Sequence, residues 1–304
     1  MLLSIPHLRD HNESFQLFHM NLIMRPGKPE DARACGDICY RAFKSIADEH
    51  NYPPDFPDTE SAIGLMNYAF SASGVYSVVA EGNGQIVGSN FLWENDFIGG
   101  VGPITVDPGC QNTTVGRKLM EQALHRAEDL KLAGVRLVQA AYHNRSLALY
   151  TKLGFDAQEP LSVIQGVAPG IHFPGYDVRP GNDADLTSCN QLCYKIHGHD
   201  RSHELPGAIK TGTFAVVEHN GIITGYTTQI GFLGHTIAAT NTGLKALIGA
   251  SSHYSGPGFL LPTRNAEVLR WCLLNGLRII MPMTLMSKGL YNDPAGAFLP
   301  SVLY

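Results

Sequence analysis

The sequence lacks several features that mark particular protein classes. No apolar stretch approaches the roughly 20 residues that a membrane-spanning helix needs. The opening, MLLSIPHLRDHNESFQLFHM, has no basic start followed by an unbroken apolar run, so it is not typical of a secretory signal. Six cysteines scattered over 304 residues do not make a disulfide framework. These absences favour a reduced, cytoplasmic protein that does not associate with a membrane.

Charge is sparse as well. Charged residues make up 16% of the chain, the net charge is −5, and no basic run occurs. Nucleic-acid-binding proteins usually carry clustered lysine and arginine, so no nucleic-acid partner is expected. The hydrophobic fraction of 44% suits globular domains with cores. At 304 residues the chain is long enough for two such domains.

An internal repeat organises the chain. Residues 25–40 read RPGKPEDARACGDICY, and residues 179–194 read RPGNDADLTSCNQLCY, which places similar segments 154 positions apart (179 − 25). Both copies continue into two β-rich runs joined by an Asn-Gly turn, YSVVAEGNGQIVGSNFL and FAVVEHNGIITGYTTQI. Such runs predict hairpins. A repeat of this length indicates duplicated domains rather than a solenoid.

The element pattern predicts an α/β fold of the α+β mixed-sheet kind. In the first copy, a strand and two helices precede a group of strands, and helices and strands then alternate as far as residue 164. We expect two tandem domains, each a mixed, largely antiparallel central sheet flanked by helices. The expected boundaries are an N-terminal extension 1–20, a first domain 21–165, a Gly- and Pro-containing linker 166–175, and a second domain 176–304.

Residues 104–134 have the pattern of an anion site. A β-branched strand ends at Asp107-Pro108, and a small polar turn then opens a long amphipathic helix. Backbone N–H groups at a helix start attract anions, and Arg117 adds a cation one turn into the helix. A pyrophosphate group suits this arrangement. A strand–turn–helix segment is common, so it does not identify a ligand alone.

A second segment makes a family resemblance specific. AAYHNRSLALYTKLGF, 140–155, follows the next predicted strand. Together the two segments resemble the GNAT acyltransferase superfamily, with its V-D-P-x-x-Q/R-x-x-G-x-G/A loop and its N-x-x-A-x-x-L/Y-Y-x-x-x-G-F helix. The resemblance covers residues 22–164. The matching positions are Val106, Asp107, Pro108, Gln111, Gly116, Asn144, Ala148, Tyr150, Gly154 and Phe155.

The resemblance implies an acetyl-CoA-dependent N-acetyltransferase, in which a small-molecule or peptide amine attacks the thioester directly. Acetyl-CoA is the implied co-substrate, 21–165 the implied catalytic domain, and no metal is expected. Tyr150 is the implied proton donor to the departing thiolate, with a packing role as the alternative. Asn144 is an implied CoA contact and also a good helix N-cap. The implied acetyl-CoA-binding residues are Ile104, Thr105, Val106, Gln111, Asn112, Thr113, Thr114, Val115, Gly116, Arg117 and Asn144.

Two aspects of the pattern leave the function open. The family's middle loop glycine is Thr114 here, and a β-branched residue disfavours the positive φ that glycine tolerates. No general base is evident, because GGVGPITV offers no carboxylate and a water relay is an equal contender. The remaining candidate bases, each typical of a solvated surface group, are Glu94, Asp96, Asp48, Glu49 and His50. A non-catalytic acyl-CoA binding or sensing protein is therefore the alternative.

The second copy lacks the chemical signature. NTGLKALIGASS replaces the glycine-rich loop, and aligning Gly276 with Gly154 (276 − 154 = 122) puts Cys272 where Tyr150 stands. We expect a degenerate GNAT-like domain that completes the acceptor pocket or packs as an internal pseudo-dimer. The chain could then be a monomer or a homodimer. The cysteine pairs Cys35/Cys39 and Cys189/Cys193 are expected to be small buried residues.

Overall fold

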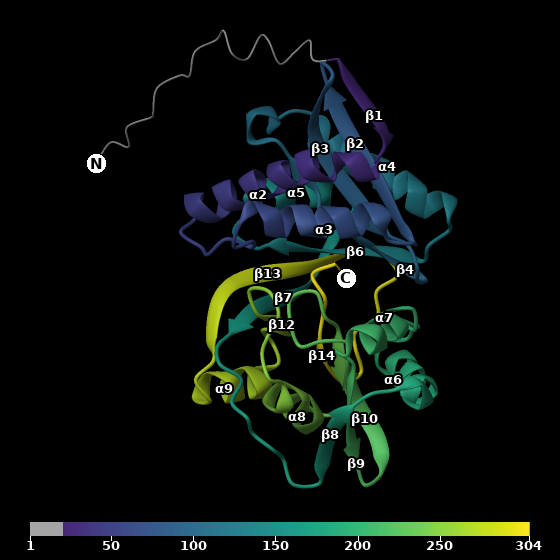
Figure 1. Cartoon of the computed structure of the whole chain (residues 1–304), viewed down its shortest axis with the longest axis vertical. Coiled ribbons are helices and arrows are strands. Elements are labelled where there is room, and N and C mark those ends of the chain that lie inside the picture. The colour runs from purple at the N-terminus through teal and green to yellow at the C-terminus, as the bar shows by residue number, and fades with distance from the viewer. Residues whose placement is uncertain (1–20, 304) are drawn as a thin grey trace, which may run out of the picture.

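The computed structural model describes residues 21–303, so the predicted extension 1–20 lies outside the described residues. The first half follows the predicted order of elements (Figure 1). Its elements are β1 (Leu22–Pro26), α2 (Ala32–Glu49), α3 (Thr59–Ser71), β2 (Val75–Gly82), β3 (Gln85–Trp93), β4 (Ile98–Val101), β5 (Thr105–Val106), α4 (Val115–Asp129), β6 (Gly134–Ala140), α5 (Asn144–Lys152) and β7 (Asp156–Gln165).

The second half repeats this order with α7 in the place of α3, but it has three strands rather than four before its next helix and adds a final strand, β14. Its elements are β8 (Tyr176–Pro180), α6 (Leu186–His197), α7 (Glu204–Thr211), β9 (Ala215–His219), β10 (Ile222–Thr227), β11 (Thr236–Ala238), α8 (Asn241–Ala250), β12 (Phe259–Pro262), α9 (Ala266–Leu274), β13 (Arg278–Gly289) and β14 (Ala297–Leu299).

The sequence repeat has a matching repeat of side-chain contacts. Arg25 on β1 donates two hydrogen bonds to the Asp31 carboxylate, at 2.7 and 2.9 Å. Arg179 on β8 makes the same pair of bonds to Asp185, both at 2.8 Å. The guanidinium holds the pKa of each carboxyl below its usual value. Each arginine thus ties the first strand of its half to the start of the next helix.

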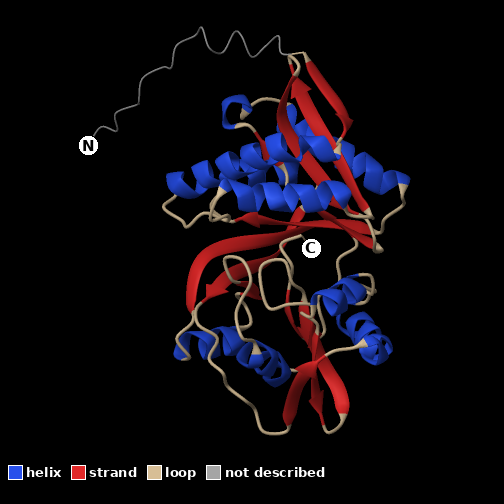
Figure 2. Ribbon diagram, in the orientation of Figure 1, coloured by secondary structure: helices blue, strands red, loops and turns tan. Residues whose placement is uncertain are grey.

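Alternating strand residues carry the helices on both faces of the first sheet. Val79 and Phe91 pack with α2 and α3, whereas Val78 and Val87 pack with Leu119 of α4. Residues one apart on a strand point to opposite faces, which separates Val78 from Val79. The irregularity between Ile86 and Gly88 of β3 places Val87 on the face opposite Phe91. Figure 2 shows the helices flanking the strands in both halves.

The strands form two sheets. The larger has nine strands in the order β1-β2-β3-β4-β6-β13-β7-β12, with β5 paired to β3, and the smaller has the order β14-β11-β10-β9-β8. Only β4 and β6 pair in parallel among the named strands of the described chain; the other pairs are antiparallel. The predicted mixed, largely antiparallel α/β fold is confirmed.

The larger sheet contains strands from both halves. β13 lies between β6 and β7, and β12 pairs with the outer side of β7. Figure 1 shows β13, in yellow, as a long curved strand running between the two halves. Strands of the two halves therefore alternate in the order β6-β13-β7-β12, and the segment 166–175 leads from β7 into β8.

The paired cysteines are buried, as predicted. Cys35, Cys39, Cys189 and Cys193 are each 0% exposed and belong to the apolar cores under α2 and α6. Burial raises the pKa of all four thiols. They pack as small apolar residues. Across residues 21–303, no helix combines the length and apolar character needed to cross a membrane.

Candidate active site

The larger sheet opens between β4 and β6. These strands pair only from Ile98/Gly134 to Gly100/Arg136, although β6 continues to Ala140. Beyond Gly100 the chain passes through Gly102, whose φ of +136° is one that glycine adopts without strain, and re-enters the sheet as β5 against β3. The chain between β4 and β5 is therefore not paired with β6, and its backbone groups lie beside the gap.

A cavity of about 1080 Å³ occupies this gap and extends between the halves. Its walls include β5, the loop before α4, and α5 from the first half. The second half contributes Phe232, Leu233, Pro257, Met283 and Val302. The cavity is of the size of small-molecule sites.

Most of the predicted acetyl-CoA-binding residues line this cavity. Val115 instead packs in the apolar core against β2 and β3, and Asn144 is the first residue of α5 but not part of the cavity wall. His143, rather than Asn144, holds the N-cap position. The predicted residues that do line the cavity are Ile104, Thr105, Val106, Gln111, Asn112, Thr113, Thr114, Gly116 and Arg117.

The loop before α4 is held in place from two sides. Asp107 accepts a hydrogen bond from Gly109 N–H at 2.8 Å and another from Arg41 of α2, also at 2.8 Å. The Thr113 hydroxyl donates to the Cys110 carbonyl at 2.7 Å. These bonds fix the turn that delivers Gly116 and Arg117 to the cavity.

Thr114 is not strained. Its φ is −82°, in the right-handed helical region, and it occupies the N-cap position of α4. The positive φ of the loop falls at Asn112, at 62°, and asparagine tolerates that conformation better than most residues. The expected conflict between threonine and a left-handed backbone at position 114 is therefore wrong.

Cationic side chains gather at the α4 and α5 side of the cavity. Arg117, Arg145 and Lys152 all line it. Arg145 also donates to the Asn112 side-chain carbonyl at 3.4 Å, which links α5 to the loop before α4. Together with the N-terminus of the 15-residue helix α4, these cations make this side suited to phosphate groups.

Tyr150 lies on α5 with 6% of its surface exposed, and it lines the cavity. Its ring packs edge-on against Phe155 with centroids 6.2 Å apart. Burial raises the pKa of Tyr150 to about 12, and a hydrogen bond with Ser146 opposes part of that rise. The phenol is therefore protonated at neutral pH, so the side chain can pack and donate a proton.

The carboxylates proposed as bases from the sequence lie outside the cavity wall and have cationic partners. Glu94 forms an ion pair with Arg126 at 2.6 Å, and Asp48 with Lys44. Glu49 lies 4.0 Å from Arg145. His50 also lies outside the wall, where its ring contacts Tyr142.

Asp55, which is not among the bases predicted from the sequence, lines the cavity instead. It sits in NYPPDFPD between α2 and α3, and burial raises its pKa to about 6. Its only signal in the sequence is an acid set among prolines and aromatics, a pattern that loops without function share.

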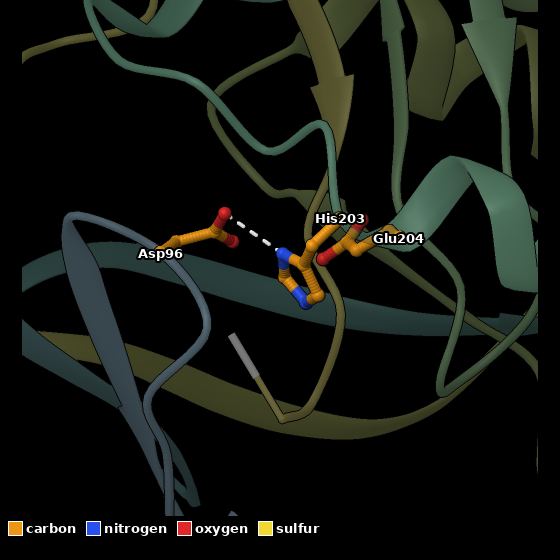
Figure 3. Close-up of side chains that lie close together, drawn as sticks. All are labelled: Asp96, His203 and Glu204. Carbon is orange, nitrogen blue, oxygen red and sulfur yellow. Dashed lines mark ion pairs between the residues drawn. The ribbon is translucent and has the colours of Figure 1, made fainter. Parts of the chain in front are cut away.

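Asp96 contacts the second half rather than the cavity. Its carboxylate lies 2.7 Å from Nδ1 of His203, and Glu204 is close by (Figure 3). The ligand atoms of these three residues lie within 4.8 Å of one another, a grouping that a metal ion could use. Glu204, however, already pairs with Arg201 and approaches His235 at 3.7 Å. The contact between Asp96 and His203 therefore joins the two halves.

The second half differs at the positions equivalent to Tyr150 and to the loop before α4. α9 starts 122 positions after α5, as aligned from the sequence, so Cys272 occupies the place of Tyr150 and is fully buried. At the start of α8, the Thr240 hydroxyl accepts a hydrogen bond from Gly243 N–H at 3.2 Å. One backbone N–H at the start of α8 therefore has a side-chain partner, as Val115 N–H has in Thr113 at the start of α4.

Comparisons with known proteins agree with this architecture. The model of the acetyltransferase (GNAT) family matches residues 41–155. An acetyltransferase assigned in Pyrococcus horikoshii has a TM-score of 0.69 at 14% identity, with 97% of each chain covered. A GCN5-related N-acetyltransferase from Sphaerobacter thermophilus has a TM-score of 0.61 at 12% identity, covering 90% of this chain and 96% of that one.

A tandem GNAT protein from the clavulanic acid biosynthesis pathway has a TM-score of 0.55 at 14% identity, covering 92% of this chain and 100% of that one. Identities this low show a shared fold. Among curated proteins, none matches this chain. Residues 41–155 are a GNAT acetyltransferase domain, a family of acyltransferases, and the chain as a whole has the fold of tandem GNAT proteins.

Proposed function

We propose that the protein is an N-acetyltransferase that moves the acetyl group of acetyl-CoA to an amine. The observation that carries this proposal is that one cavity brings together the loop before α4, the phenol of Tyr150 and a wall from the second half. A two-substrate transfer needs such a shared space, because the thioester and the amine must meet in the same site.

The cationic side of the cavity would hold the phosphates of acetyl-CoA. Arg117, Arg145 and Lys152 supply positive charge, and Gly116 at the start of α4 exposes backbone without a Cβ. The backbone of residues 102–106, unpaired with β6, would receive the thioester. A backbone N–H there would stabilise the negative charge that develops on the carbonyl oxygen.

Tyr150 would supply the proton that the departing thiolate takes up. Its pKa of about 12 lies above that of an ordinary thiol, so the transfer from phenol to thiolate is uphill in isolation. In the cavity, the buried phenol would act through a hydrogen bond that strengthens as negative charge forms on sulfur. The second half would complete the acceptor side of the cavity, making the chain an internal pseudo-dimer.

The test combines binding with turnover. Titration calorimetry with acetyl-CoA and with CoA measures affinity, and release of free thiol from acetyl-CoA over a panel of amines measures transfer. We expect acetyl-CoA binding and amine-dependent thiol release. Binding without release on any amine would instead favour a non-catalytic acyl-CoA sensor, and the absence of binding would contradict both functions.

Tyr150→Phe separates the roles of this side chain. Phenylalanine keeps the ring contact with Phe155 but cannot donate a proton. We expect turnover to fall by about 10²- to 10⁴-fold while acetyl-CoA affinity stays nearly unchanged. Unchanged turnover would assign Tyr150 to packing alone.

A further inference from the structure

The loop between α2 and α3 places a carboxylate in the cavity. Asp55 lines the cavity together with its neighbours Phe56 and Pro57. Among the lining residues, all within the described chain, Asp55 is the single aspartate or glutamate. The Asp55 carboxylate can therefore act on an acceptor molecule bound in the same cavity as acetyl-CoA.

Asp55 differs from the other carboxylates around the site in having no cation beside it. No ion pair joins it to any lysine, arginine or histidine between residues 21 and 303. Its charge instead acts on the Tyr142 phenol and the Cys39 thiol, and it raises the pKa of both. An unneutralised carboxylate beside apolar and weakly acidic groups favours a bound proton or a bound cation.

The wall on the Asp55 side of the cavity is largely apolar. Phe43 and Ile46 of α2 and Leu65 of α3 line it from the first half. Phe232 and Leu233 line the cavity from the second half. The cations of the cavity come from other elements, α4 and α5. The two sides therefore differ in chemistry, one suited to phosphates and the other to an apolar molecule with a basic group.

We infer that Asp55 accepts the proton that the attacking nitrogen loses, and that the acceptor is an amine carried on an apolar body. This inference rests on the proposed function. It supplies the base that the strand segment GGVGPITV lacks, and it names the class of acceptor that this wall favours.

The transfer step balances with these groups. The nitrogen lone pair forms a bond to the thioester carbonyl carbon, and the electron pair of the C=O bond moves to oxygen. Asp55 takes a proton from the nitrogen, the C=O bond re-forms, and the C–S bond breaks. The thiolate then takes a proton from Tyr150. One proton is gained by Asp55 and one is lost by Tyr150 as amine and thioester become amide and thiol. Asp55 then releases its proton to solvent and Tyr150 takes one from solvent, which restores both groups.

The other ionisable groups of the cavity are poorer bases near neutral pH. Burial lowers the pKa of His143 to about 4, and its Nδ1 is engaged by the Ser146 hydroxyl at 2.6 Å. Burial raises the pKa of Cys110, Tyr142 and Tyr150. The remaining ionisable residues of the cavity wall are Tyr68, Arg117, Arg145 and Lys152.

The experiment compares Asp55→Asn with Asp58→Asn in the full chain. Asp58 lies on the same loop but caps α3 by accepting from Ser61 N–H at 2.8 Å, outside the cavity wall. Asparagine can also cap a helix, so this variant makes the same chemical change without loss of the cap. The amine probes are phenethylamine and hexylamine, with putrescine as an amine that carries a second charge and no apolar end.

We expect turnover with phenethylamine or hexylamine to exceed turnover with putrescine. The profile of kcat/KM against pH should show an acidic limb near 6 that belongs to Asp55. In Asp55→Asn this limb disappears, the limb set by the amine remains, and kcat/KM falls by about 10²- to 10⁴-fold. Asp58→Asn keeps both limbs, and both variants bind acetyl-CoA as the unaltered protein does.

The contrary outcomes separate this inference from the proposed function. Turnover that survives in Asp55→Asn with the limb near pH 6 intact would overturn the role of Asp55 and leave the transferase standing. A preference for putrescine would overturn the acceptor class. Acetyl-CoA binding without thiol release on any amine would overturn the proposed function, and this inference with it.

Discussion

Leu285 on β13 lies opposite Val138 on β6, so a strand of the second half occupies the place beside the penultimate strand of the first half. Ile164 on β7 is in turn opposite Phe259 on β12. Strands of the two halves thus alternate in the order β6-β13-β7-β12, and the backbone hydrogen bonds between these strands cross from one half to the other. Met283 of β13 lines the cavity together with Leu137 and Val138 of β6, so this strand exchange contributes to the cavity wall.

This exchange predicts that the halves unfold together. The chain has two tryptophans, Trp93 in the first half and Trp271 in the second, so Trp93→Phe and Trp271→Phe each leave one fluorescent reporter. We expect both variants to give a single transition whose midpoint by fluorescence coincides with that by circular dichroism. Leu285→Ala, at a site 2% exposed, should destabilise the whole protein by about 2–5 kcal/mol and shift both reporters equally.

The contrary result would be a midpoint that depends on which tryptophan reports. A Leu285→Ala shift confined to the Trp271 reporter would have the same meaning, because it would make the second half an independent unit. Leu290→Ala is the matched control, since that leucine lies just beyond β13 and is 39% exposed.

The sequence predicted the elements because their signals are local. Asn-Gly turns, alternating β-rich runs and the repeated RPG segment each specify structure within a few residues, and the contacts of Arg25 and Arg179 follow the repeat. The strand exchange has no such signal. β7, β12 and β13 all carry buried apolar residues such as Val163, Leu260 and Met283, so their pattern does not say which strand pairs with which.

The part of the site that could be predicted is likewise the part formed by residues close together in the sequence. Residues of the loop before α4 are close in sequence, and most of them line the cavity together. Asp55 joins them only because α2, α3 and the second half enclose the same space. A loop acid gives no hint of such an enclosure, since residues as distant in the sequence as Phe232 line the same cavity.

Thr114→Gly tests whether the departure from the family's loop pattern weakens the site. Because Thr114 already has a helical φ of −82°, glycine would relieve no strain there. Glycine would enlarge the conformational freedom of the unfolded chain, so we expect a loss of about 0.5–1 kcal/mol in the free energy of unfolding. Acetyl-CoA affinity, measured by calorimetry, should not rise. A clear gain in affinity would mean that threonine obstructs the loop.

The cations beside α4 and α5 should govern acetyl-CoA affinity. Arg117→Gln and Arg145→Gln each remove one positive charge from the cavity wall. We expect each to weaken acetyl-CoA binding by about tenfold at low salt and by less at high salt, because the contacts are charge-assisted and screened. Lys118→Gln is the matched control, since Lys118 is the next residue on α4 and lies outside the wall. An equal effect of Lys118→Gln would indicate general electrostatic attraction rather than contact.

The buried pair His197 and His235 should make the protein sensitive to acid. Their Nε2 atoms lie 3.0 Å apart, and the side chains are 4% and 2% exposed. Burial lowers the pKa of both rings well below the usual value, and the charge of Arg201 acts in the same direction. Below about pH 6.5 the unfolded chain therefore binds protons that the folded protein does not. The free energy of unfolding then decreases as the pH is lowered.

Urea unfolding at about pH 7.5 and about pH 5.5 checks this dependence, with each histidine contributing a slope of up to about 1.4 kcal/mol per pH unit. His197→Gln combined with His235→Gln should flatten the slope, whereas His125→Gln, at an exposed position on α4, should not.

Asp55 affects the free energy of unfolding in the opposite sense, because its raised pKa makes the folded protein bind more protons than the unfolded chain below about pH 6. Since Asp55 is unchanged in all of these variants, the difference in slope belongs to the histidine pair. An unaltered slope in the double variant would show that other groups set the acid sensitivity.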